Sequence, residues 1–206
     1  MSRLISRNGL SRLSADYYDC LYQLYQAGEA EKLIEAYKQV LNVIEHSTNR
    51  EIQAVLSTKV FLKDDLQKKE IESIAENLEK LGTAFREEAQ NVYKKLCRSL
   101  GIKAKAPTLS EDEKKLRRII PVRAENFICP LQAEYIEEKL SPEALRETRL
   151  SGYAAYEALN FADGNRSILD ITNAVSAEFG AVNPLSIYTF FKLLQKAELI
   201  QFKVGK

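Results

Sequence analysis

The sequence is short of the residue types that most catalytic and metal-binding sites require. It has one histidine, His46, and three cysteines, Cys20, Cys97 and Cys129. The cysteines lie far apart, without the short C-x-x-C spacing of redox and metal sites, and are best explained as buried or idle thiols. No H-E-x-x-H motif and no glycine-rich phosphate loop occurs. We therefore expect no cofactor, no metal ion and no catalysis by this chain alone.

The sequence also lacks a net charge and a long apolar run. Its 30 Lys and Arg nearly balance 29 Asp and Glu, so no overall basic field attracts nucleic acid, and any such site would be a local patch. No run reaches the roughly 18 to 20 apolar residues of a membrane span, and the N-terminus lacks the apolar core of a secretory signal. These features predict a cytoplasmic protein that spans no membrane.

Proline is absent between residues 14 and 100, and glycine occurs there only at positions 28 and 82, which favours helices throughout. The first predicted helix runs from Ser14, as N-cap, to Ala27, with Gly28 ending it. One face of this helix carries four apolar side chains: Tyr18, Leu21, Tyr22 and Tyr25.

A second predicted helix begins near Glu29, and the polar stretch 46–49 is expected to break or cap it before the apolar spacing resumes at Ile52. In the segment 71–96, apolar residues recur in steps of three and four, which is typical of a seam between packed helices. The same stripe could line a partner-binding groove, but core packing is the commoner cause. The pattern predicts a helical bundle over residues 1–105.

Residues 103–112, KAKAPTLSED, combine a basic tract, a proline and a polar run, which is typical of a linker. The stretch 114–131 holds two prolines and short apolar groups, which favours extended or irregular structure. Helix is expected again near Leu131, and from Ser141-Pro142, where proline would be the first helical residue. Residues 106–150 are thus predicted to be a linker and connecting segment.

The segment 151–206 begins with a short predicted helix over 152–161, with Tyr153, Ala155, Tyr156 and Leu159 available for its core. The sequence DGNRS follows, in which aspartate and glycine tolerate left-handed backbone and serine is placed to cap the next helix. We expect a structural turn there, although a ligand loop with an anion-binding arginine is the alternative. The candidate turn or interaction residues are Asp163, Gly164, Arg166 and Ser167.

The next predicted helix closes at Gly180, and a third opens at Asn183-Pro184. Alternating apolar residues over 199–204 predict a terminal strand. Three helices followed by a strand is the order of a winged helix. The expected fold is therefore mainly α, with an N-terminal helical bundle followed by a C-terminal winged-helix-like module over 151–206.

Winged helices commonly bind DNA, and the charge of residues 151–206 indicates whether this module is suited to do so. Residues 151–206 carry five acidic and five basic residues, so the module is neutral. A recognition helix contacts bases near its N-terminal end, but the third predicted helix has no basic residue before Lys192. DNA is therefore a possible but disfavoured partner.

The stretch YEALNFADGNRSILDITNAVSAEFGAVNPLSIYTFFKLLQKAELI, residues 156–200, resembles the C-terminal winged-helix segment of some bacterial zinc aminopeptidases of the M28 family. The likeness covers about the last 90 residues, because the upstream RRIIPVRAENFICPL is similar to the region that joins this segment to a helical part. A looser likeness is to small winged-helix domains that bind peptides. The family's chemistry uses histidine and carboxylate ligands around two zinc ions, and a chain with a single histidine lacks that set.

These observations predict a non-catalytic structural or protein-interaction chain, whose partner is another protein or a separate catalytic domain, and which could form a homo-oligomer. One alternative is a transcriptional regulator in which the bundle dimerises and the winged helix reads DNA. Another is a fragment of a functional zinc peptidase whose catalytic domain lies elsewhere, in which case the parent enzyme could be exported.

Overall fold

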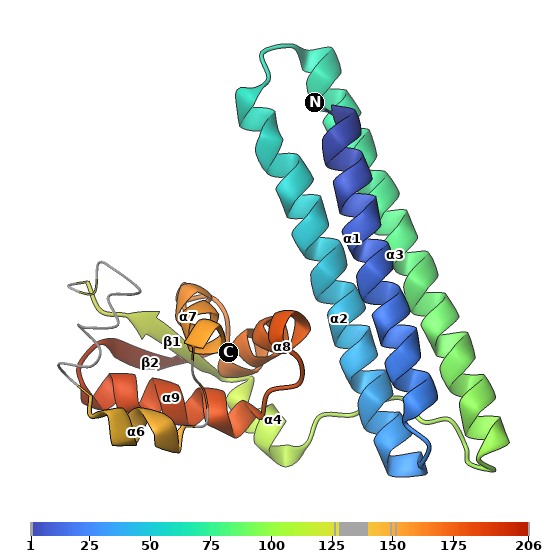
Figure 1. Ribbon diagram of the computed structural model, residues 1–206. Coiled ribbons are helices and arrows are strands. Elements are labelled where there is room, and N and C mark those ends of the chain that lie inside the picture. Colours follow the sequence, from blue (N-terminus) through green and yellow to red (C-terminus); the bar gives the residue numbers. More distant parts are fainter. Residues whose placement is uncertain (1, 126, 128–139, 149, 151, 206) are drawn as a thin grey trace. The chain divides into compact units, whose positions relative to one another are not determined.

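The computed structural model describes residues 2–125, 127, 140–148, 150 and 152–205. The chain divides into two compact units, residues 1–107 (unit 1) and 108–206 (unit 2). Unit 1 consists of long helices, and unit 2 of shorter helices with a small sheet (Figure 1). The expected mainly α fold with a helical bundle is confirmed.

The helices of unit 1 run alongside one another as a bundle (Figure 1). They are α1 (Ser2–Gln26), α2 (Ala30–Ser57) and α3 (Asp65–Ser99), and a short 3-10 helix (Thr58–Phe61) follows α2. Gly28, at φ +58°, makes the turn from α1 to α2, as its place after the first predicted helix indicates. The regular apolar spacing of residues 71–96 forms the buried face of α3, so that stripe is core, as expected.

The predicted start of the first helix is wrong. α1 begins at Ser2 rather than after a cap at Ser14. Leu13, directly before the expected cap, is fully buried in the bundle. Because bundle packing extends beyond Ser14 toward the N-terminus, tertiary contacts outweigh the local capping preference of that serine.

The predicted break at 46–49 is also wrong, because α2 continues through it. The hydroxyl of Thr48 donates to the carbonyl oxygen of Ile44 (2.6 Å), and that of Ser47 donates to the carboxylate of Asp16 in α1 (2.6 Å). These hydroxyls therefore do not compete for the backbone N–H groups of the helix. Gly82 of α3 lies against Thr48, and a β-carbon there would overlap its side chain, so glycine permits the close approach of α2 and α3.

The core side of α1 is formed by residues spaced three and four apart: Leu13, Tyr17, Cys20 and Leu24. The ring of Tyr17 stacks on that of Phe85 in α3, with centroids 4.0 Å apart and planes 3° apart. The face with the other tyrosines of α1 is therefore turned away from the core.

Unit 2 packs its helices against a small antiparallel sheet (Figure 1). β1 (Ile119–Arg123) pairs with β2 (Ile200–Val204), and Pro121 lies opposite Phe202. The strand predicted near the C-terminus is confirmed, and its partner lies in the stretch expected to be extended or irregular. The helices of unit 2 are α4 (Glu111–Leu116), α6 (Pro142–Glu147), α7 (Gly152–Asn160), α8 (Ile168–Phe179) and α9 (Pro184–Lys196).

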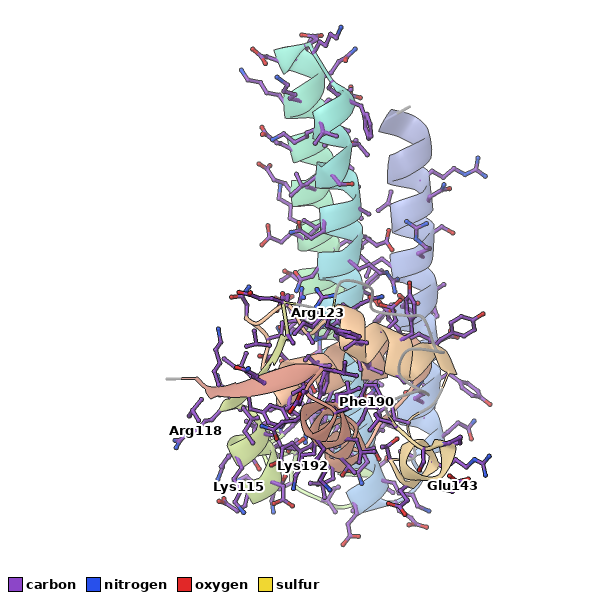
Figure 2. All side chains as sticks on the ribbon, turned by 90° about the vertical axis from the view of Figure 1, so that its left-hand side faces the viewer. Lys115, Arg118, Arg123, Glu143, Phe190 and Lys192 are labelled. Carbon is purple, nitrogen blue, oxygen red and sulfur yellow. The ribbon has the colours of Figure 1, made fainter. Side chains whose placement is uncertain are left out.

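The core of unit 2 lies between these helices and the sheet. Phe191 and Leu194 of α9 are fully buried, and Phe190 is 3% exposed. Figure 2 shows Phe190 within the unit, whereas Lys192 of the same helix lies toward the outside. α9 is thus amphipathic, with its apolar face in the core.

The predicted boundaries of α8 and α9 are confirmed. Ser167 caps α8 in a reciprocal box with Asp170, and Gly180, at φ +85°, follows the end of that helix. Asn183 caps α9, and Pro184 is in its first turn. These boundaries depend on contacts within four residues, so local sequence is sufficient to predict them.

The expected core role is confirmed for Leu159, which is fully buried, but it is wrong for Tyr153 and Tyr156, which are 81% and 38% exposed. Residues 108–150, expected to connect two parts, contribute α4, β1 and α6 to unit 2, with Leu116 in its core. α6 begins at the predicted proline. The helix expected near residue 131 lies outside the described residues.

Candidate functional site

One tight turn between α7 and α8 holds all four candidate residues: Asp163, Gly164, Arg166 and Ser167. The carboxylate of Asp163 accepts hydrogen bonds from the backbone N–H groups of Asn165 (2.8 Å) and Arg166 (3.0 Å). Its backbone forms a β-bridge with Val122 of β1. Burial alone would raise the pKa of Asp163, but these hydrogen bonds and the charge of Arg166 outweigh burial and lower that pKa. Asp163 is a carboxylate that organises the turn.

The side chain of Arg166 folds back on the same turn. Its Nη1 lies 2.9 Å from Oδ2 of Asp163, and its guanidinium lies 5.3 Å from the ring centroid of Phe161. Gly164 adopts φ +77°, and a β-carbon there would lie at an ordinary 3.6 Å from Val122. The backbone conformation, rather than lack of space, is therefore what favours glycine.

Ser167 closes the turn from a buried position. Its Oγ accepts from the Asp170 N–H (3.2 Å), and its hydroxyl and backbone N–H both donate to Oδ2 of Asp170 (2.7 and 2.9 Å). The turn thus fixes the α7–α8 corner against β1 with contacts among its own residues. Arg166, with a side chain 46% exposed, is the member that an anion could still reach.

The described thiols are poor nucleophiles. Cys20 and Cys97 are buried in unit 1. Burial raises the pKa of Cys20 to about 12, and the charges of Asp16 and Asp19 act in the same direction, so the thiol stays protonated at neutral pH. Cys129 lies outside the described residues.

The part of the chain that the structure describes contains no group of three or more His, Cys, Asp or Glu placed to hold a metal ion. No helix within the same residues has both the length and the apolar character of a membrane span.

A polar cluster joins α1 to α2 where the sequence shows no motif. The carboxylate of Glu51, 1% exposed, accepts two hydrogen bonds from Arg12 (2.9 and 2.6 Å) and one from Arg50 (3.1 Å). Arg50 also donates to Asp16 (2.9 Å), which binds Ser47 as well. Since 39 residues separate Arg12 from Glu51, no local pattern could reveal this cluster. It fixes the register of α1 against α2.

Three tyrosines form an exposed ridge along α1. Tyr18, Tyr22 and Tyr25 are 67%, 65% and 60% exposed, and their spacing of four and three places them on one face of the helix. The same face continues toward the N-terminus with Ser11 and Ala15, which are small and exposed. We call these five residues the tyrosine ridge. Its members are all uncharged, and exposed aromatic surface of this kind is typical of protein interfaces.

A hollow of about 360 Å³ lies in unit 1 where residues 104–107 fold back on α2 and α3. Its floor includes the stacked rings of Tyr37 and Tyr93, with centroids 4.0 Å apart, and the Tyr93 hydroxyl donates to the Lys105 carbonyl oxygen (3.0 Å). Lys94 and Arg86 also line it, but a carboxylate of Glu45 lies 3.6 Å from Arg86. The hollow suits a small ligand with an apolar body and a weak anionic group.

No family model, curated protein or solved structure matches this chain.

Proposed function

We propose that this chain is a non-catalytic protein-interaction module that binds its partner through the tyrosine ridge of α1. The observation that carries the proposal is the exposure of Tyr18, Tyr22 and Tyr25 on one uncharged helix face. The solvent face of a bundle helix normally carries charged side chains. Tyrosine is enriched among the residues that dominate binding energy, because its ring offers a large contact area and its hydroxyl a hydrogen bond at little cost in side-chain entropy.

The tyrosine ridge packs against buried aromatic side chains, which favours binding. The ring of Tyr18 contacts the ring of the buried Tyr17, with centroids 5.4 Å apart, and Tyr17 is itself stacked on Phe85. The polar cluster around Glu51 holds α1 in register through Arg12 and Asp16 of the same helix. A binding surface on a fixed helix loses less conformational freedom on association than a loop would.

We also propose that the chain corresponds to the C-terminal region of an M28-family-like zinc aminopeptidase, so that the partner includes a catalytic domain. The support is the residue pattern of 156–200. The coding sequence upstream of this chain tests the proposal. An in-frame α/β domain rich in histidine and carboxylates would support it, and an unrelated reading frame would count against it.

The same proposal treats unit 2 as a winged-helix-like module. In support, α7, α8 and α9 are followed by β2, and the bridge from Asp163 to Val122 lies where a winged helix has a short strand between its first two helices. The strand beside β2 is β1, however, which comes from upstream rather than from a hairpin after α9. The proposed module is therefore a variant in which an upstream strand completes the sheet.

Site-specific photo-crosslinking tests the interaction function. A benzoylphenylalanine replaces Tyr22 in the full chain, expressed in its own host, and the matched control carries the same group in place of Lys80, which is exposed on α3. We expect defined protein adducts on irradiation at position 22 and none at position 80. Absence of adducts at 22, or equal adducts at both positions, would contradict the proposed function.

A further inference from the structure

We propose that the tyrosine ridge pairs with the same ridge of a second copy of the chain, with the two α1 helices antiparallel about a two-fold axis at Tyr18. The inference rests on the proposed function, in that the ridge is taken to be a protein-binding face, and it names the partner.

The first argument is that the two halves of the ridge are complementary in side-chain size. A two-fold axis at Tyr18 places Tyr25 of one copy opposite Ser11 of the other, because each lies seven residues from residue 18. Tyr22, four residues from the axis, falls opposite the small residues Ser14 and Ala15, which lie four and three residues from it on the other side. On either side of Tyr18, large rings therefore meet small side chains. An isologous interface requires such a match between the two halves of one surface, and small residues opposite large ones allow helix axes to approach to about 8–10 Å.

The second argument is the ring at the centre. The Tyr18 side chains of the two copies would meet each other at the axis, where offset or edge-on aromatic pairs are favourable. Each Tyr18 is backed by its own Tyr17 at a centroid distance of 5.4 Å. Each ring in the central contact is thus already packed against the core of its own copy.

The third argument is charge. The five ridge residues carry no charge, so the ridge itself contributes no repulsion between two copies. Among the neighbouring charged residues of α1, Arg12 and Asp16 are held by the polar cluster with α2, whereas Asp19 is exposed beside the ridge. The antiparallel arrangement is favoured over the parallel one by side-chain size, because a parallel pairing in register would place each tyrosine against the same tyrosine of the other copy.

The size of the surface sets the expected strength. From Ser11 to Tyr25 the ridge is roughly 21 Å long at 1.5 Å per residue, and at about 10 Å width it offers roughly 200 Å² per copy. Stable dimers bury about 800 Å² per partner, so the pairing is a weak one. We expect a dissociation constant on the order of 10–100 µM.

Disulfide trapping tests the register. The background is Cys129→Ser in the full chain, since Cys20 and Cys97 are buried. With Tyr18→Cys, mild oxidation should give a covalent dimer. Ser11→Cys alone should stay monomeric, but should link to Tyr25→Cys when the two variants are mixed. Ser11→Cys dimers formed alone would indicate a parallel arrangement and overturn the proposal, and Lys80→Cys is the control for random collisions.

Sedimentation equilibrium provides the second readout. The parent chain should dimerise at high micromolar concentration, and Tyr22→Lys should raise the dissociation constant at least 10-fold by placing like charges in the contact. Tyr153→Lys, at an exposed tyrosine of unit 2, should leave the dissociation constant unchanged. A parent chain that stays monomeric, or a dimer whose dissociation constant is unchanged by Tyr22→Lys, overturns this inference. If the monomeric chain still gives adducts at position 22 on photo-crosslinking, the proposed function stands with a different partner.

Discussion

Arg12 holds the buried carboxylate of Glu51 with two hydrogen bonds, from Nε to Oε1 at 2.9 Å and from Nη2 to Oε2 at 2.6 Å. The pair links the N-terminal half of α1 to the C-terminal half of α2. Burial alone would raise the pKa of Glu51, but the hydrogen bonds and charges of Arg12 and Arg50 outweigh burial and lower that pKa. The tyrosine ridge therefore lies on a helix whose position depends on an ionised glutamate.

Because the folded pKa of Glu51 is below its ordinary value, its ionised form contributes stability above a pH of about 4.5, and this contribution is lost as the pH falls through the folded pKa. We expect Glu51→Gln to lower the free energy of unfolding by about 2 kcal/mol at pH 7, as for hydrogen bonds to charged groups. The difference between variant and parent should narrow as the pH approaches 3. Urea unfolding monitored by circular dichroism measures the free energy of unfolding of parent and variant at pH 7 and at lower pH.

Glu72→Gln is the matched control for Glu51→Gln. Its carboxylate, 49% exposed, pairs with Lys59 at the surface, where solvent screening leaves such an ion pair little effect on stability. The assignment of Glu51 would be wrong if both variants lost equally little stability at pH 7, or if the Glu51→Gln difference stayed constant down to pH 3.

The turn between α7 and α8 should be structural. Gly164→Val places a β-branched residue at φ +77°, which we expect to cost about 1–3 kcal/mol, and Ser167→Ala removes the cap of α8 at about 1 kcal/mol. Thermal melts should show both variants unfolding unit 2 at lower temperature, with unit 1 much less affected. Thr189→Ala, at an exposed position of α9, is the control with little expected change. Melts identical to the parent for both variants would contradict this role.

Arg166→Ala separates the structural role of that turn from the ligand-loop alternative. The variant loses a half-exposed ion pair and a ring contact, so we expect a cost of about 0.5 kcal/mol. Photo-crosslinking from position 22 should be unchanged in this background. Loss of those adducts without loss of stability would instead favour Arg166 as a direct anion contact.

Duplex DNA should bind only weakly. Lys115, Arg118 and Lys192 lie on the outside of unit 2 (Figure 2), but Lys115 is already 3.6 Å from Asp112. With about three phosphate contacts, the slope of log affinity against log salt should be no steeper than about −3. A fluorescence titration with random duplex measures it, and sub-micromolar affinity with a slope beyond about −5 would favour the regulator alternative.

Local chemistry made much of unit 2 predictable from sequence. The cap at Ser167, the proline start of α9 and the positive φ of Gly164 follow from contacts within a few residues. The pairing of β1 with β2 was not predictable in this way, because about 80 residues separate Pro121 from Phe202 and neither strand carries a signal for its partner.

The interaction surface was harder to predict, because both sides of α1 carry aromatic residues. Tyr17 and Tyr18 are adjacent in sequence, yet one is 5% exposed and the other 67%. Which side is buried depends on α2 and α3, and on the distant polar contact of Arg12 with Glu51. A helical pattern indicates the spacing of a buried face, but neighbouring helices select that face.

Hydroxyl-radical footprinting of the tyrosines at increasing protein concentration tests most directly the claim that the tyrosine ridge pairs with the ridge of a second copy. Tyr153, 81% exposed in unit 2, serves as the internal reference for Tyr22, which is 65% exposed. The account predicts that oxidation of Tyr22 falls several-fold between about 1 and 500 µM chain, a range that spans the expected dissociation constant, while oxidation of Tyr153 stays constant. Tyr22 oxidised as readily as Tyr153 at every concentration, or protected already at the lowest one, would contradict it.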